Sequence, residues 1–411
     1  MRERCIILSI LCAFLFGNCT LHPQDIITID LTNEYPVLDM KLSDIANVSY
    51  IQLKGKDSAI FLTDMHEYDN AIYIDGNYIF ISDCFPVEKD IETKTTYVLS
   101  DAAHLYLYDI NGNFIRSIVN PGTSDNEFFG YGMNFTVHLS SETITIHGTT
   151  KDVLQIYDFY GNYKGCRNLG KRYSDNVAFN DKLMFVDYSS QYIISNGDVK
   201  DNGQTLMFYD VNALEQITFP DIHIPAIYAK PGYTTKNKII RTYSGAYLVT
   251  PRTDTIFHVD YNFNISPRFV SIWHDTESDN CLIPIAETSE YVLFSSDIDY
   301  ISSVKGKLQY KTYLFDKINN QIYLVDSGND AQGSFETSIF MDGMLLGSCN
   351  TTQNPNMLAY VLPIMFLKEN YRKLPEKLRQ MTDMAADDDN PILMIVKIKE
   401  NPQDFNNLIK K

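Results

Sequence analysis

Asp109, Asn111 and Asn113 place three oxygen-bearing side chains at alternate positions, as the first ligands of a calcium-binding loop do. Such a loop also needs a glycine at its sixth position and a bidentate glutamate at its twelfth. Those two positions hold Phe114 and Asn120 in this chain. We therefore interpret the segment as a tight turn, because Asp and Asn side chains readily hydrogen-bond their own turn backbone.

Other sequence motifs with a known chemistry are absent. The chain has no G-x-S-x-G elbow, no Walker A sequence and no G-x-G-x-x-G fingerprint. Its eight histidines form no HExxH pair, no C-x-x-C sequence exists, and one histidine, His258, replaces an apolar residue of a repeated strand. With 52 acidic residues, no carboxylate pair is singled out for glycoside hydrolysis. The sequence thus predicts no catalytic residue, no metal site and no cofactor.

Charge and composition restrict the partners and the fold class. The formal net charge is −18, which repels phosphate backbones, so we expect no nucleic-acid partner. Tyr and Phe number 28 and 23 against a single Trp. Abundant Tyr, Phe and β-branched residues favour strands, so the composition predicts an all-β protein.

The N-terminus has the pattern of an export signal. Arg2 and Arg4 precede an apolar run over residues 6–16, which is too short to span a membrane but matches the core of a secretory signal peptide. The run ends in Gly17, Asn18 and Cys19, which resembles a bacterial lipoprotein box. We therefore expect a signal peptide over residues 1–18 and a lipid on Cys19; the alternative is an ordinary cleaved signal in which Cys19 is incidental.

Two short patterns recur along the rest of the chain. The first is a turn followed by an apolar strand, and the second is an apolar strand that ends in Asp before another turn. The first occurs at 76–81, 141–146, 181–186, 244–249, 289–294 and 342–346. The second ends at Asp109, Asp158, Asp210, Asp260 and Asp316, which are 49 to 56 residues apart.

A unit of about fifty residues with roughly four short strands is typical of a propeller blade, because one such sheet needs neighbours to bury both of its faces. The number of copies favours six blades, and the alternative is a pair of β-sandwiches. The first pattern would form an inner strand of each blade and the second would begin its outer hairpin. Repeat tyrosines such as Tyr106 and Tyr157 lie within strands, so we interpret them as packing residues rather than as a sugar-stacking surface.

The two ends of the chain offer strands that could close the ring. Residues 48–53 alternate in polarity, and residues 391–398 form an apolar, β-branched run. Between the last blade and that run, residues 363–386 have helical spacing and predict a short helical insertion. We expect a tether over residues 19–40 and one propeller domain over residues 41–411.

The arrangement of these segments resembles the six-bladed β-propeller lipoproteins of Bacteroidetes, a family with NHL-like repeats and largely unknown function. The residues that carry the resemblance are 42–53, the hairpin at 105–114 and the end segment 390–399. The resemblance implies the fold, export and a lipid anchor in the outer membrane, and it supplies no active site. It does not distinguish a periplasmic from a surface-facing protein.

Together these observations favour a lipid-anchored envelope protein that binds a ligand, a glycan or a protein partner, with its membrane contact made through Cys19. The alternatives are an envelope hydrolase or lyase acting on a glycan at the mouth of the central channel, and a structural subunit. Four further cysteines, Cys84, Cys166, Cys281 and Cys349, are scattered along the chain. We expect them to be free and largely buried.

Overall fold

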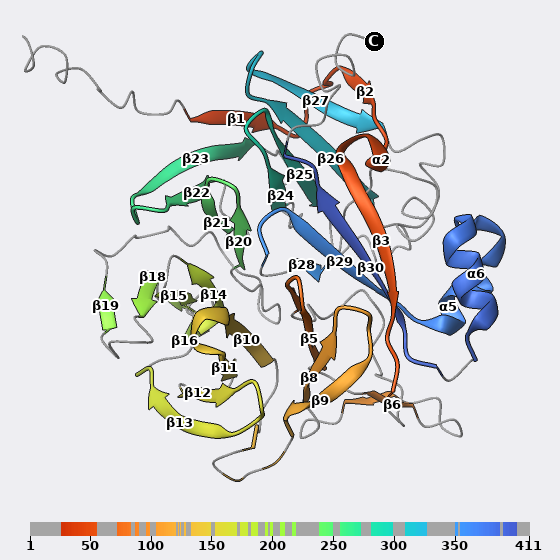
Figure 1. The fold of residues 1–411 in the computed structure, drawn as a ribbon. Helices are drawn as coiled ribbons and strands as arrows, with labels where there is room; N and C mark the ends of the chain where they lie inside the picture. Colours follow the sequence, from red (N-terminus) through yellow and green to blue (C-terminus); the bar gives the residue numbers. More distant parts are fainter. Residues whose placement is uncertain are drawn as a thin grey trace, which may run out of the picture.

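The chain folds as an all-β propeller, in which antiparallel sheets are arranged around a common centre (Figure 1). The computed structural model describes residues 26–55, 72–83, 87–89, 96–98, 104–120, 122, 124, 127–128, 133–148, 153–170, 173–179, 182–187, 194–195, 198–199, 206–209, 216–218, 238–249, 255–272, 281–298, 309–326, 350–351, 354–386 and 389–400. The signal segment 1–18 and Cys19 lie outside these residues.

The ring consists of sheets that follow one another along the chain, numbered here in that order. Sheet 1 contains β4 (Ile72–Ile74), β5 (Tyr78–Asp83), β8 (His104–Asp109) and β9 (Phe114–Val119). Sheet 2 contains β10 (Met133–His138), β11 (Thr143–Gly148), β12 (Val153–Asp158) and β13 (Tyr163–Asn168). Sheet 3 contains β14 (Tyr173–Phe179), β15 (Lys182–Asp187), β18 (Leu206–Tyr209) and β19 (Gln216–Thr218).

The second half of the chain continues the series. Sheet 4 contains β20 (Lys238–Thr242), β21 (Gly245–Val249), β22 (Thr255–Asp260) and β23 (Ile265–Ile272). Sheet 5 contains β24 (Cys281–Glu287), β25 (Tyr291–Ile298), β26 (Gln309–Asp316) and β27 (Gln321–Asp326). The closing sheet contains β28 (Asn350–Thr351), β29 (Met357–Leu362), β30 (Ile392–Ile398) and β3 (Ala46–Gln52). Two small hairpins, β6 (Val87–Lys89) with β7 (Thr96–Val98) and β16 (Ile194–Ser195) with β17 (Asp198–Val199), stand apart.

The two repeated sequence patterns occupy neighbouring strands of each sheet. The apolar strand of the first pattern forms β5, β11, β15, β21 and β25, the second strands of sheets 1 to 5. The strand of the second pattern forms β8, β12, β18, β22 and β26, which pair with them antiparallel. The sixth copy of the first pattern, at 342–346, lies outside the described residues.

Hydrophobic clusters fill the spaces between neighbouring sheets. Phe80 of sheet 1 packs against Phe135 of sheet 2 with 6.5 Å between ring centroids, and Phe269 of sheet 4 packs against Phe294 of sheet 5 at 4.8 Å. Each fully buried aromatic stabilises the fold by roughly 1.5–3 kcal/mol. The repeat tyrosines Tyr106, Tyr108, Tyr157 and Tyr313 are all buried, which confirms their interpretation as packing residues.

The two ends of the chain meet in the closing sheet. β3 pairs antiparallel with β30 along its whole length, from Ala46 opposite Ile398 to Gln52 opposite Ile392. β3 is the outermost strand of this sheet (Figure 1). A strand from the beginning of the propeller therefore completes a sheet built from its end.

The expected tether at 19–40 is too long, because its second part belongs to the ring. β1 (Ile27–Asp30) adds a parallel fifth strand to sheet 4, and β2 (Val37–Asp39) adds one to sheet 5. Ile29 and Leu38 are buried there. These strands have three or four residues each, too few to show an alternating pattern, and they form because the outer edges of β23 and β27 have unpaired backbone groups.

The segment between β29 and β30 contains α5 (Ile364–Glu369), a short 3₁₀ turn (Tyr371–Lys373) and α6 (Glu376–Met384). Pro363 and Pro375 precede the two helices, where a missing N–H costs no intrahelical hydrogen bond. Leu374 and Leu378 are buried in the same cluster as the closing sheet. A shorter helix, α2 (Leu42–Ile45), leads into β3.

The expectation of buried cysteines is wrong for Cys166, which is free and exposed. Cys166 lies on β13, the outermost strand of sheet 2. An outer strand has no neighbour on one side, so its side chains are mostly solvated. Nothing is described of the side chains of the other three cysteines.

Gly112 is expected to be indispensable for attaching the closing sheet to sheet 1. Its φ is +82°, and an added Cβ would lie 2.2 Å from the backbone oxygen of Gln52 in β3. Gly112→Ala should lower the free energy of unfolding by about 3 kcal/mol, from the left-handed backbone cost together with the steric overlap. Chemical denaturation measures this loss.

Gly170→Ala is the matched control, because Gly170 also has a positive φ, +75°, but no atom within 4 Å of an added Cβ. It should lose only about 1 kcal/mol. Equal losses at the two positions would show that the contact between the turn and β3 is not tight.

Candidate functional site

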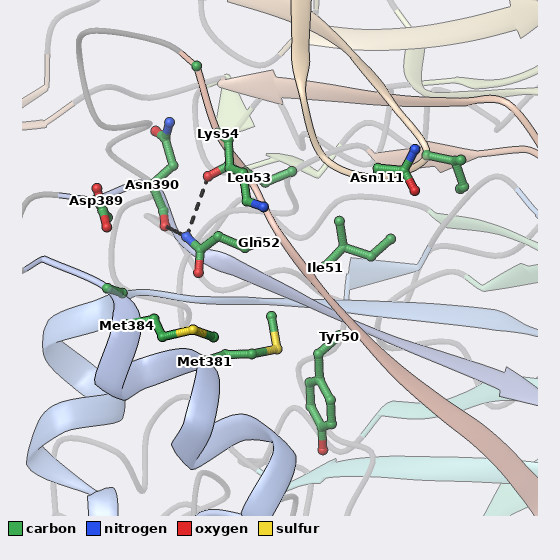
Figure 2. Close-up of a pocket in the computed structure, with 13 residues that line it drawn as sticks. Tyr50, Ile51, Gln52, Leu53, Lys54, Asn111, Met381, Met384, Asp389 and Asn390 are labelled. Atoms are coloured by element: carbon green, nitrogen blue, oxygen red, sulfur yellow. Dashed lines mark hydrogen bonds between the residues drawn. The ribbon is translucent and has the colours of Figure 1, made fainter.

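A groove of about 680 Å³ lies at the outer edge of the closing sheet, where β3, the turn between β8 and β9, and the end of α6 meet (Figure 2). Its volume is in the range of ligand pockets in proteins. The residues that line it come from four segments: 50–55, Ile110 and Asn111, Met381 with Met384 and Ala385, and Asp389 and Asn390, of which the last two are close in sequence. The lining comprises Tyr50, Ile51, Gln52, Leu53, Lys54, Gly55, Ile110, Asn111, Met381, Met384, Ala385, Asp389 and Asn390.

One wall of the groove is the chain that continues β3. The Lys54 backbone N–H donates to the Gly112 carbonyl at 2.8 Å, and the Phe114 N–H donates to the Lys54 carbonyl at 2.9 Å. The Gln52 side-chain amide donates to the carbonyl of Asn390, which fixes the entry to β30 (Figure 2). The wall is therefore held from sheet 1 on one side and from β30 on the other.

A second wall is the turn at 109–113, which the sequence pattern identified as a turn. The Asp109 carboxylate accepts hydrogen bonds from the backbone N–H groups of Asn111 and Asn113, both at 2.9 Å, and from the Asn113 side chain at 2.8 Å. These bonds, the Asn113 side chain first, lower the pKa of Asp109. Asp109 thus rigidifies the turn, which agrees with the interpretation of this segment as a tight turn.

The same turn recurs in sheets 2 and 4. Asp158 accepts from the N–H groups of Tyr160 and Asn162, and Asp260 accepts from those of Asn262 and Asn264. Burial raises the pKa of Asp260, but the hydrogen bonds from Asn264 and Asn262 outweigh it and the net pKa is lowered. The repeated Asp pattern also predicted the turn at 260–264, in which Phe263, and not glycine, has the positive φ, +65°.

The third side of the groove is the C-terminal end of α6. Met384 is 79% exposed, and Met381 is partly buried beside it against the closing sheet. The helix ends at Ala385, and the Asp389 carboxylate accepts from the Ala386 N–H at 2.8 Å, which shapes the loop into β30. Two thioethers and a methyl group therefore form an apolar surface beside polar walls.

The polar groups of the groove are suited to binding a ligand. Lys54 is exposed and makes no ion pair with another described residue, and the Asn111 side chain makes no hydrogen bond to one. Among the lining residues there is no Ser, Thr, Cys or His, and the one side-chain hydroxyl is the phenol of Tyr50. The groove presents amides, one cation and one anion around an apolar surface.

A second polar cluster lies between sheets 4 and 5 and is centred on Glu287. Its carboxylate accepts from Lys317 Nζ at 2.6 Å, from Thr242 Oγ1 at 2.9 Å and from Ser244 Oγ. Its backbone is fixed by Asn356 of the closing sheet, whose amide donates to the Glu287 carbonyl at 2.6 Å and accepts from the Glu287 N–H at 3.0 Å. Glu287 therefore connects three consecutive sheets.

His258 completes this cluster, with Nε2 2.8 Å from Ser244 Oγ. In a hydrolytic triad the histidine lies between the acid and the serine, so that it can take the serine proton. Here the serine lies between Glu287 and His258 and donates its proton to the carboxylate. Burial lowers the pKa of His258, an effect that the Glu287 charge opposes. The three groups are therefore not ordered as in a hydrolytic triad, and they form a hydrogen-bonded network between the two sheets.

A third group of polar residues is buried between sheets 2 and 3. It includes Thr136, Thr145, His147 and Asn176, with His138 Nε2 3.1 Å from Thr145 Oγ1. Burial lowers the pKa of His138 to about 4, so this imidazole is neutral at pH 7. Within the described residues, no three His, Cys, Asp or Glu side chains converge as metal ligands.

Comparisons with known proteins address the fold. No protein-family model and no curated protein matches the sequence. A Bacteroides fragilis protein named an exported protein has a similar structure, with a TM-score of 0.62 and 17% identity, over 91% of this chain and 100% of that one. A member of the DUF4221 family from Bacteroides vulgatus aligns at a TM-score of 0.45 and 8% identity, over 87% of this chain and 99% of that one.

The first of these similarities shows that the propeller fold extends over nearly the whole chain of an exported Bacteroides protein. In the described part of this chain, no helix has both the length and the apolar character of a membrane span. The class of protein that the fold and the comparison define is therefore a β-propeller, similar in fold to a protein of Bacteroides fragilis.

Glu287 is expected to stabilise the fold in a pH-dependent way. Burial raises its pKa, but the Lys317 charge and the hydrogen bonds from Lys317, Ser244 and Thr242 outweigh burial and lower it below the ordinary 4.5. A depressed folded-state pKa adds stability above the unfolded pKa that is lost as the pH falls through the folded value. Glu287→Gln should therefore cost about 3 kcal/mol at pH 7 and progressively less below about pH 4.5.

Urea denaturation of wild type and variant between pH 3 and pH 7 measures this difference. Glu142→Gln, at an exposed glutamate in the turn before β11, serves as control and should change little at any pH. A Glu287→Gln penalty that is constant across the pH range would contradict the ion pair with Lys317.

Proposed function

We propose that this chain is an exported, lipid-anchored propeller of the bacterial outer membrane that binds a ligand or a protein partner in the groove between β3 and α6. The observation that carries the binding role is the groove itself, in which an exposed methionine surface faces polar groups of three other segments. Contiguous apolar patches rimmed by polar residues mark protein interaction sites and ligand-binding grooves. Met384 is 79% exposed and lies beside the partly buried Met381 and the polar walls of the groove.

We further assign the chain to the six-bladed Bacteroidetes lipoprotein family that its sequence resembles. Six sheets of four or five strands among the described residues support six blades. The similar fold of the exported Bacteroides fragilis protein supports export and the family. The lipoprotein pattern at Cys19 supports the anchor.

A lipid on Cys19 would leave the groove accessible. Seven residues lie between Cys19 and the start of β1 at Ile27, and the eight Cα–Cα steps span at most about 28 Å. The anchor would therefore hold the outer edge of sheet 4 near the membrane. β1 lies at the top of the ring and α6 at its right-hand side (Figure 1), so the groove would lie away from the anchored edge of sheet 4.

Metabolic labelling tests the anchor. A clickable fatty acid should label the wild-type protein in a bacterial host with lipoprotein processing, and Cys19→Ala should be unlabelled. Cys5→Ala, directly before the apolar run of the signal segment, is the control and should retain the label. A wild-type protein without label would end the lipid-anchor proposal.

The competing function is an envelope hydrolase or lyase acting on a glycan, for which the 2.8 Å contact between Ser244 and His258 is the observation in favour. Glycans, peptidoglycan fragments and short peptides should be screened by calorimetry against the purified protein, with product formation followed in the same samples. We expect binding without product. Turnover that Ser244→Ala abolishes would establish the enzyme instead.

Two methionine variants test the location of binding. Met384→Glu should weaken any ligand found in that screen by about tenfold or more, since it places a charge on the apolar surface. Met365→Glu is the matched control, because Met365 is 51% exposed on α5 and does not line the groove. Equal affinities for the two variants would exclude the groove as the binding site.

A further inference from the structure

The apolar surface of the groove is formed by aliphatic and thioether groups and not by aromatic rings. Met381, Met384 and Ala385 supply it, from one turn of α6. Methionine is unbranched and polarizable, so it adapts to aliphatic side chains of differing shape. Such a surface accepts a branched or linear hydrocarbon side chain better than a flat ring.

A sugar ring would need a flat aromatic face to stack on, and the groove has few aromatic side chains. Tyr50 is the one aromatic residue among the lining residues. The Lys377 ammonium lies 5.9 Å from the centre of its ring, in cation–π geometry. That cation competes with a ligand for the face of the tyrosine.

The walls provide what a peptide backbone requires. The Asn111 carboxamide carries both donors and an acceptor, which match the C=O and N–H groups of an extended chain. The Gln52 side chain adds its amide oxygen as an acceptor, since its NH2 group donates to the carbonyls of Leu53 and Asn390. Lys54 and Asp389 contribute one charge of each sign, so the groove itself selects neither a strong anion nor a strong cation. The field of the whole chain, with a net charge of −18, disfavours acidic partners.

We propose that the occupant of the groove is a short, extended, neutral or basic peptide segment of a partner protein, with one aliphatic side chain seated on Met381 and Met384. This rests on the proposed binding function and adds the chemical class of the ligand. The peptide backbone lies along Gln52 to Gly55 and hydrogen-bonds the Asn111 side chain.

Selection from a displayed library of random linear peptides tests the proposal with the full mature chain. The library is selected on the wild type after depletion on Met384→Glu, and selected peptides are synthesised for calorimetry. We expect peptides that share one aliphatic residue and lack net negative charge. Their affinity should fall at least about tenfold with Met384→Glu and about threefold with Asn111→Ala, and stay unchanged with Met365→Glu.

Met384 and Asn111 are at the surface, so both variants should keep the wild-type melting temperature, which is measured alongside. A library that yields no peptide dependent on Met384 overturns the inference. If a glycan then binds in the same Met384-dependent way, the proposed groove function stands while the peptide class is wrong. If neither peptides nor glycans bind, both proposals fail.

Discussion

The antiparallel pairing of β3 with β30 is the constraint on which the rest of the structure depends. The two strands are joined through the whole ring, with Ala46 opposite Ile398 and Gln52 opposite Ile392. Bringing such distant segments together costs loop-closure entropy, which the intervening sheets reduce by holding the ends close before they pair. Once paired, the ends leave no open gap between the closing sheet and sheet 1.

The candidate groove is a consequence of that closure. Gln52 reaches from β3 to the Asn390 carbonyl, and the Lys54 backbone pairs with Gly112 and Phe114 of sheet 1. None of these contacts exists in an open ring. The Glu287 cluster also connects neighbouring sheets, since it joins side chains of sheets 4 and 5 to Asn356 of the closing sheet. These two sets of hydrogen bonds thus fix how neighbouring sheets are aligned. The apolar packing between the sheets is non-directional and does not set that alignment by itself.

The sequence predicted those parts of the fold that depend on local patterns. The strands β5, β8, β11 and β12 were predicted from alternating apolar residues and from Asp turns, because both signals depend only on residues close together in sequence. β1 and β2 could not be predicted, because three or four residues carry no period and pair only with edges that the finished sheets provide. The repeated Asp pattern also predicted the turn after Asp260, although Phe263 there occupies a conformation usually reserved for glycine. The groove was beyond sequence reasoning altogether, since Lys54, Asn111 and Met384 come together only through ring closure.

Native-state hydrogen exchange tests the closed ring most directly. If the pairing of β3 and β30 makes the ring one cooperative unit, amides in residues 46–52 should exchange with the same opening free energy as amides of β11 and β25. The mature chain lacking a lipid is sufficient for this measurement. Exchange of residues 46–52 and 392–398 at a lower free energy than the other sheets would contradict the account, because it would show that the ring opens at its ends while the rest stays folded.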